Sequence, residues 1–283
     1  MSLDEPSADP AATPSRWTGT PNWYLWDGGF AALGRSEGVV PPHDHHAIQI
    51  VVAIEGRIGI QGERGDWRMA PGIIVQPDVV HSYNGNGAVG AMIFVDPESA
   101  EGGWLKTSLR DDITVVPEAR IARCAGELRK FLESPLESLE IGPLLRHCVH
   151  ALCAGAPPSR RLDERVTKVL AAIRASDELR ISIEDAAAMA FLSPSRFAHL
   201  FKQQVGLPFR RYMLWRKLTR AMLVIGRERT IATAAHEADF ADAAHLTRTF
   251  YQMFGLPPSV MMRGEFFEIS SPFERPTIPE RRG

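Results

Sequence analysis

One octapeptide pattern occurs twice in the C-terminal half of this chain. It reads Phe201-Lys202-Gln203-Gln204-Val205-Gly206-Leu207-Pro208 and then Phe250-Tyr251-Gln252-Met253-Phe254-Gly255-Leu256-Pro257. Upstream of each copy stands a pair of alanines with the same spacing, Ala187-x-x-Ala190 and Ala235-x-x-Ala238. Two copies are too few for a solenoid, which needs at least about three repeats. The repeat therefore predicts two similar helical subdomains.

The first copy predicts a short helix, a tight turn and a second helix. Ser182 and Asp185 have the spacing of a capping box, which begins a helix. Residues 191–192 form the turn, Ser193 caps the next helix, and Pro194 stands at its first position, where the missing N–H costs nothing.

The second copy repeats this plan. It begins near Thr230, turns at residues 239–240 and is capped again by Asp242. A long helix from Pro208 to Ile225 joins the two copies. That helix is strongly basic, with Arg210, Arg211, Arg216, Lys217 and Arg220.

A short helix followed by a tight turn and a polar second helix is the helix-turn-helix plan. The second helix fits the DNA major groove, while N-terminal amides and basic residues hold phosphates. The expected DNA-contacting residues of the first copy are Ser193, Ser195, Arg196, His199 and Lys202, and those of the second are Asp242, Ala243, Ala244, His245 and Arg248. The alternatives are a helical bundle whose basic face is only solvated and a protein-interaction module.

The charge distribution favours DNA binding. The formal net charge is −2, but residues 1–159 contain 12 Lys and Arg against 20 Asp and Glu, whereas residues 160–283 contain 20 against 14. A basic half joined to an acidic half is typical of a polyanion-binding unit fused to another domain.

Composition excludes some other classes. With 45% hydrophobic and 23% charged residues the chain is that of an ordinary globular protein. No stretch approaches the roughly 18 apolar residues of a membrane span, and the first residues lack the order of a secretory signal. We therefore expect a cytoplasmic protein with no membrane partner.

The repeat region resembles the AraC-type DNA-binding domain, from Ala187 through Pro208, along the joining helix, and from Ala235 through Arg263. The most specific pieces are residues 192–197, the Phe-Lys-x3-Gly-Leu-Pro stretch from Phe201, and residues 245–250. The resemblance implies that each recognition helix enters one of two successive major-groove segments. Ser195, Arg196 and His199 would then face bases in the first segment, and Ala243, Ala244 and Arg248 in the second.

Within that resemblance, Arg248 is the expected guanine contact, because its fork matches O6 and N7. Three departures weaken the second unit. Asp239 stands where the family often has Gly, Tyr251-Gln252 replaces a usually basic pair, and Met261-Met262 stands where Tyr-Arg is usual.

The region from Trp23 to Val95 has the texture of short strands. Residues 48–54, 57–61 and 72–75 are rich in β-branched side chains and are separated by glycine-containing turns. Such spacing predicts an antiparallel sandwich or barrel.

Two patterns in this region resemble the cupin motifs: Gly38-x4-His43-x-His45-x3-Gln49-x6-Gly56 and Pro77-x3-His81-x2-Asn84. The resemblance implies a small double-sheet barrel with a pocket in its mouth. It also implies a metal set at His43, His45, Gln49 and His81, in which Gln49 replaces the usual carboxylate. Three imidazoles still suit Zn²⁺, Ni²⁺ or Fe²⁺.

The alternative for these histidines is an effector pocket without metal, which Tyr83 would also line. His46 is expected to face the opposite way, because neighbouring residues of a strand alternate.

Residues 117–155 predict two amphipathic helices, the first opened by Pro117 and the second over 141–154. Their apolar stripes fit either internal packing or a dimer interface. Cys124, Cys148 and Cys153 are too few and too clustered for a disulfide framework. We expect them to be small buried apolar side chains.

The sequence thus predicts a two-domain fold, an all-β cupin barrel followed by amphipathic helices and an all-α double helix-turn-helix domain. The expected segments are a mobile arm (1–21), a cupin-like effector-sensing domain (22–116), a helical dimerisation or linker segment (117–155), an AraC-type DNA-binding domain (160–265) and a tail (266–283).

The predicted function is a transcriptional regulator, not an enzyme. Its expected partners are double-stranded promoter DNA, a small-molecule effector and a second copy of the chain, with RNA polymerase added if the protein is an activator. The alternative is a metal-dependent cupin enzyme, of isomerase or dioxygenase type, fused to a DNA-binding domain.

Overall fold

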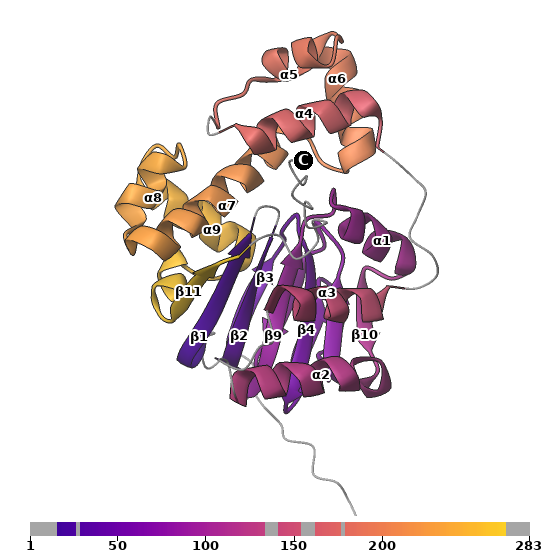
Figure 1. The fold of residues 1–283 in the computed structure, drawn as a ribbon, viewed down its shortest axis with the longest axis vertical. Coiled ribbons are helices and arrows are strands. Elements are labelled where there is room, and N and C mark those ends of the chain that lie inside the picture. Colours follow the sequence, from indigo (N-terminus) through magenta and orange to yellow (C-terminus); the bar gives the residue numbers. More distant parts are fainter. Residues whose placement is uncertain (1–15, 27–28, 134–140, 154–161, 177–178, 270–283) are drawn as a thin grey trace, which may run out of the picture.

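The fold has a sheet-rich N-terminal part and a helical C-terminal part that pack against each other (Figure 1). It is a computed structural model, which describes residues 16–26, 29–133, 141–153, 162–176 and 179–269. Most of the expected mobile arm and most of the expected tail lie outside the described residues, as do residues 154–161 between the two expected domains.

The strands form two sheets. The first has seven strands in the order β10-β7-β4-β9-β2-β1-β11, and the second has four in the order β3-β8-β5-β6. The strands are β1 (Arg16–Trp26), β2 (Gly29–Glu37), β3 (Val39–His43), β4 (Ile48–Glu55), β5 (Ile58–Gly62), β6 (Arg68–Ala70), β7 (Gly72–Val75), β8 (His81–Asn84), β9 (Ala88–Val95), β10 (Ile113–Val116) and β11 (Glu265–Glu268). The double sheet agrees with the prediction, but the pairing does not close a barrel.

The seven-stranded sheet is buried on both faces, which explains its unbroken apolar runs. Along β1, Tyr24 and Trp26 pack with the helices of the N-terminal part, whereas Trp23 and Leu25 pack with helices of the C-terminal part. The four-stranded sheet covers only another portion of the second face, around Val51 and Ile73. The C-terminal part therefore completes the layer that a closed barrel would have formed by itself.

Helices α2 (Glu118–Glu133) and α3 (Ile141–Leu152) cover the first face of the large sheet (Figure 1). Their apolar stripes, which include Ile121, Leu128, Leu145 and Val149, lie in one core with the sheet. These stripes are thus used within the chain. Helix α1 (Ala100–Ser108), which the sequence did not predict, packs beside α3.

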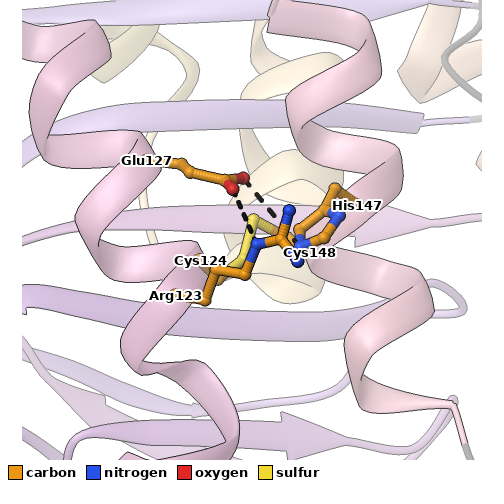
Figure 2. Close-up of a disulfide and its surroundings, with 5 residues drawn as sticks. All are labelled: Arg123, Cys124, Glu127, His147 and Cys148. Carbon is orange, nitrogen blue, oxygen red and sulfur yellow. Dashed lines mark hydrogen bonds and ion pairs between the residues drawn. A yellow bond between two sulfur atoms is a disulfide. The ribbon is translucent and has the colours of Figure 1, made fainter.

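The expectation for the cysteines was wrong in one respect. Cys124 and Cys148 are buried, as expected, but they are joined by a disulfide between α2 and α3, with their Cα atoms 5.4 Å apart. The two cysteines lie on helices that pack against each other, and this packing brings their sulfur atoms together. Figure 2 shows Glu127 beside this disulfide, paired with Arg123 and His147. Cys153 is free and half-buried.

The C-terminal part contains α4 (Glu164–Ala175), α5 (Ile183–Met189), α6 (Pro194–Val205), α7 (Phe209–Glu228), α8 (Ile231–Glu237), α9 (Ala243–Phe254) and a 3₁₀ turn over Pro258–Met262. Three of the predicted caps are present. Ser182 and Asp185 form a capping box, Ser193 accepts a hydrogen bond from the Arg196 amide, and Asp242 accepts one from the His245 amide. Thr230 begins α8 without a side-chain cap.

Two predicted boundaries were wrong. Strand β1 begins at Arg16, inside the segment that we expected to be a mobile arm. Strand β11 lies where the tail was expected and pairs in parallel with β1. Phe266 stacks on Trp23 and Phe267 on Tyr24. Among the described residues, no helix combines the length and apolarity needed to cross a membrane.

Candidate DNA-binding face and histidine pocket

Helices α6 and α9 each expose part of their first two turns to solvent. On α6, Ser195, Arg196, His199 and Lys202 are exposed. On α9, Ala244 and Arg248 are exposed, whereas Ala243 and His245 are half-buried. The opposite faces are anchored by buried aromatics, Phe197 and Phe201 in the first unit and Phe250 and Phe254 in the second. Both predicted recognition helices are thus held by their apolar faces with their polar faces free.

The three predicted histidines of the N-terminal part come together. The ring centroids lie 4.3 Å apart for His43 and His81, 5.1 Å for His45 and His81, and 5.7 Å for His43 and His45. One nitrogen of each ring lies within 4.8 Å of the others, so the cluster has the spacing of a metal site. His43 and His81 are cross-strand neighbours on β3 and β8, whereas His45 reaches the cluster from the loop after β3.

Each of these rings has its Nδ1 beside a backbone carbonyl oxygen. The partners are Pro41 for His43 at 2.9 Å, Ala47 for His45 at 2.8 Å, and Val79 for His81 at 2.9 Å. A neutral imidazole carries one N–H. With that hydrogen on Nδ1, all three Nε2 atoms keep a lone pair available.

Gln49 lies between two of those nitrogens. Its side-chain oxygen is 3.1 Å from Nε2 of His45 and 2.8 Å from Nε2 of His81. Two lone pairs facing one oxygen repel, unless the amide turns over to donate its N–H groups or a cation lies among the three atoms. These side chains therefore suit either a Gln49 amide that donates hydrogen bonds to the histidines or a cation bound among them.

Burial keeps these imidazoles neutral. It lowers the pKa of His43 to about 3, lowers the pKa of His45, and takes that of His81 well below its usual value. Neutral rings suit metal coordination and polar contacts with a ligand.

A narrow, mostly apolar pocket lies between the N-terminal part and the second helix-turn-helix unit. Its walls are residues from both parts of the chain, with His43, Gln49, Tyr83 and Ser36 as polar groups: Trp23, Phe30, Ala32, Ser36, Val40, His43, Gln49, Tyr83, Met92, Phe94, Met222, Phe250, Phe254, Leu256, Val260 and Met261. The structure thus brings three of the predicted pocket residues to this pocket. His45 and His81 do not line it and contact it through Gln49.

Helix α9 touches the histidine cluster at its C-terminal end. Gly255 ends the helix with φ of +64°, and a Cβ at this position would lie 2.4 Å from Val40 and 3.2 Å from Nδ1 of His43. Only glycine allows this approach together with the left-handed backbone. The second unit and the pocket are therefore in direct contact.

A second buried cluster, which the sequence did not predict, joins the N-terminal part to α4. Nε2 of His46 lies 2.7 Å from the Glu98 carboxylate, and its Nδ1 lies 3.4 Å from that of Asp78. Arg174 of α4 donates to Asp96 at 3.0 Å. Residues so far apart in sequence give no local pattern, which is why this cluster could not be predicted. His46 turns away from the other histidines, as expected.

The charges of this cluster depend on each other. Burial alone would lower the pKa of His46, but Glu98 and Asp78 raise it to about 9. Burial and the neighbouring Glu98 raise the pKa of Asp96 to about 8. At neutral pH we expect His46 to be charged and Asp96 to hold a proton.

Comparison with known proteins agrees with the C-terminal architecture. A family model described as a helix-turn-helix domain matches residues 186–264. A probable transcriptional regulator, LumQ of Photobacterium leiognathi, is 23% identical over 238 residues, 80% of this chain and 92% of its own length. The arabinose operon regulatory protein of Escherichia coli is 34% identical over 107 residues, 36% of each chain.

Solved structures of ToxT from Vibrio cholerae share the fold at 10% sequence identity. One has a TM-score of 0.54 and matches 88% of this chain and 97% of its own. Another, bound to an unsaturated fatty acid, has a TM-score of 0.53 and matches 88% of this chain and 92% of its own.

Fold and exposed helices together define a DNA-binding protein with two helix-turn-helix units and a sheet-rich N-terminal domain. Residues 186–264 carry a helix-turn-helix domain, and the chain is similar to transcriptional regulators that include the arabinose operon regulatory protein.

Proposed function

We propose that this chain is a sequence-specific regulator whose N-terminal domain, residues 22–116, senses a small molecule and thereby changes promoter binding by residues 160–265. One observation carries the proposal: the pocket has walls from both domains. A ligand there contacts the sensing domain and the second DNA-binding unit at once. It can shift the arrangement of the two only by its difference in affinity for the alternatives.

For DNA reading, we assign bases in one groove segment to Ser195, Arg196 and His199, and bases in the next to Ala243, Ala244 and Arg248. Lys202 and His245 approach the phosphates, and Ser193 and Asp242 cap the two helices whose N-terminal amides do the same. Arg248 is exposed on α9. Its guanidinium is free to make the bidentate guanine contact.

The ligand that fits the pocket is a largely apolar small molecule with one polar end. Phe30, Phe94 and Phe254 form the apolar wall, and His43, Gln49 and Tyr83 offer hydrogen bonds. A ToxT structure with the same fold is described as bound to an unsaturated fatty acid. An amphipathic acid of that class is therefore the first ligand to test.

A divalent metal ion is the second ligand that we propose, held by His43, His45 and His81 with the Gln49 oxygen. The fit rests on the three carbonyl-bound Nδ1 atoms, since metal-binding histidines usually donate their other N–H in this way. Bound there, Zn²⁺, Ni²⁺ or Fe²⁺ would supply a positive charge that polarises a ligand's oxygen.

A metal ion at this site would also be compatible with the alternative of a metal-dependent cupin enzyme. The described residues that line the pocket include no carboxylate that could act as an acid or base. Stoichiometric metal in the purified full chain, lost in His81→Ala and kept in the control His236→Ala at an exposed histidine of α8, would support the metal site. Absence of bound Zn²⁺, Ni²⁺ and Fe²⁺ after saturation would leave the pocket to organic ligands.

We also propose two protein partners at the promoter, a second copy of the chain and RNA polymerase. A homodimer would place two DNA-binding domains on neighbouring half-sites, and an activator would also contact RNA polymerase. The apolar faces of α2 and α3 are used internally, so a dimer would have to use other surfaces.

The test of DNA reading starts from a pool of random duplexes selected by the full chain. We expect Arg248→Ala to weaken binding to the selected duplex by about 1–3 kcal/mol and to relax the preference at one base pair. Arg64→Ala, an exposed arginine of the N-terminal domain, is the matched control. Equal behaviour of the two variants would refute the role of Arg248.

A further inference from the structure

We propose that Asp239 is a positioning residue that fixes the orientation of one helix-turn-helix unit relative to the other, and so sets the spacing of the two DNA segments that they read. The proposal rests on the proposed DNA reading and concerns how it is made selective. It starts from a departure in the sequence, an aspartate where AraC-type domains often have glycine.

Asp239 joins three parts of the DNA-binding domain. It lies in the turn between α8 and α9, and one carboxylate oxygen accepts from Nζ of Lys217 on α7 at 2.5 Å. The other accepts from Nε of Arg180 at 2.5 Å. Lys217 also donates to the Asp239 backbone oxygen, at 3.0 Å. A glycine could make only the last of these contacts.

Arg180 belongs to the first unit. It stands two residues before Ser182, the cap of α5, so its position moves with that helix. Its neighbour Leu179 is buried in the core of the second unit, with Phe240 and Leu246. An apolar contact and a charged contact therefore hold the same short segment against the second unit.

The contacts are placed where the two units face each other. A cleft between them is lined by Arg180, Lys217, Asp239 and Phe240, together with His245 at the start of α9. The side chain of Arg180 is 77% exposed, while those of Lys217 and Asp239 are 23% and 22% exposed. Because Arg180 is so exposed, its ion pair with Asp239 adds little to stability. We therefore expect loss of this pair to change the relative orientation of the two units rather than the stability of the fold.

The backbone supports this view. Asp239 has φ of +58°, a conformation that glycine adopts more readily. Phe191 occupies the matching turn of the first unit, at φ of +53°, and has no carboxylate. The bridge is therefore present on one side only, and it is directed at the other unit.

The first experiment measures spacing selectivity. A duplex selected from a random pool by the full chain is remade with one base pair added or removed between the two footprinted segments. We expect the wild type to lose about tenfold or more in affinity, since a shifted segment loses at least one base contact. Arg180→Ala and Asp239→Gly should each lose about threefold or less on the same duplexes, with Asp239→Asn in between.

The control is Glu237→Ala, which removes an exposed negative charge two residues away. It should keep the wild-type spacing preference. If Arg180→Ala and Asp239→Gly discriminate as steeply as the wild type, or weaken on all duplexes equally, Asp239 does not position the units.

A second experiment needs no DNA and separates this proposal from DNA reading. Spin labels at Ser195→Cys on α6 and Ala244→Cys on α9, in a Cys153→Ser background, report the distance between the recognition helices. We expect a broader distance distribution in Arg180→Ala and Asp239→Gly than in Glu237→Ala. An unchanged distribution overturns the positioning role even where DNA is bound. A broader distribution without any selected duplex supports positioning and overturns DNA reading.

Discussion

Phe191 lies in the turn between the two helices of the first helix-turn-helix unit, in a backbone conformation that glycine adopts more readily. It has φ of +53° and its side chain is 91% exposed, so it combines an unfavourable backbone with an unburied aromatic ring. A non-glycine residue in this conformation costs roughly 1–3 kcal/mol, and glycine avoids most of that cost.

We therefore predict that Phe191→Gly raises the free energy of unfolding by about 1 kcal/mol. Urea denaturation of the full chain measures it. The control is Ala188→Gly, at an exposed position inside α5, which should lower stability by about 1 kcal/mol. A loss of stability in both variants would mean that the Phe191 ring makes a contact worth more than the backbone strain.

Asp96 carries a pH dependence of its own. Burial and Glu98 raise its pKa from 3.8 to about 8, in contact with Arg174 and near His46 and Tyr212. A carboxyl group whose pKa is raised on folding contributes stability below its unfolded pKa, and that stability is lost as the pH rises through its folded pKa.

Asp96→Asn removes this loss. We predict that its unfolding free energy, relative to that of the wild type, rises between pH 5 and pH 6.5, by up to about 1.4 kcal/mol per pH unit. Chemical denaturation at several pH values measures it, and a flat difference would show that Asp96 is ionised throughout.

Strand β11 is the element that ties the end of the DNA-binding domain to the sensing domain. It adds four residue pairs in parallel to β1, and Trp23 also donates from its indole to the Arg263 carbonyl oxygen at 3.1 Å. Arg229 of the second unit lies over the Phe266 ring, 5.0 Å from its centre. The strand is thus held by both domains.

We predict that ending the chain after Gly264 exposes β1 and loosens the second unit. Backbone amides of β1 and α9 should exchange with deuterium faster than in the full chain. A chain ending after Ile269 keeps β11 and serves as the control. Equal exchange in the two truncated chains would mean that the shared core alone holds the unit.

The sequence predicted those elements that depend on residues close together in the chain. The caps at Ser182, Ser193 and Asp242 begin helices where expected, because each depends on residues a few positions away. Strand β11 was missed because its four residues gain their structure from β1, far away in the chain. The disulfide was missed for the same reason, since its geometry comes from the packing of α2 on α3.

At the scale of the whole molecule, the two oppositely charged halves meet. Arg211 of α7 is bonded to Asp44. Part of the basic charge that indicated a DNA-binding half is therefore neutralised by the chain's own N-terminal domain. The histidine cluster could be predicted from its motifs. The wall that α9 adds to the pocket could not, because it depends on how the domains pack.

The sheet and the second helix-turn-helix unit share one hydrophobic core. Trp23, Phe30 and Phe94 of the sheet lie in the same cluster as Trp215, Leu246 and Phe254 of the second unit. A ligand beside these residues and a DNA duplex on α9 would act on the same unit. Their effects on each other are then reciprocal, as linkage requires.

DNA reading by the full chain is tested by measuring its binding to the selected duplex and to a scrambled one, at two salt concentrations. We predict a preference of about 10³ or more for the selected duplex. We also predict that both affinities fall with salt, in proportion to the phosphates contacted. Equal affinity for the two duplexes, or affinity that does not change with salt, would refute sequence-specific DNA binding.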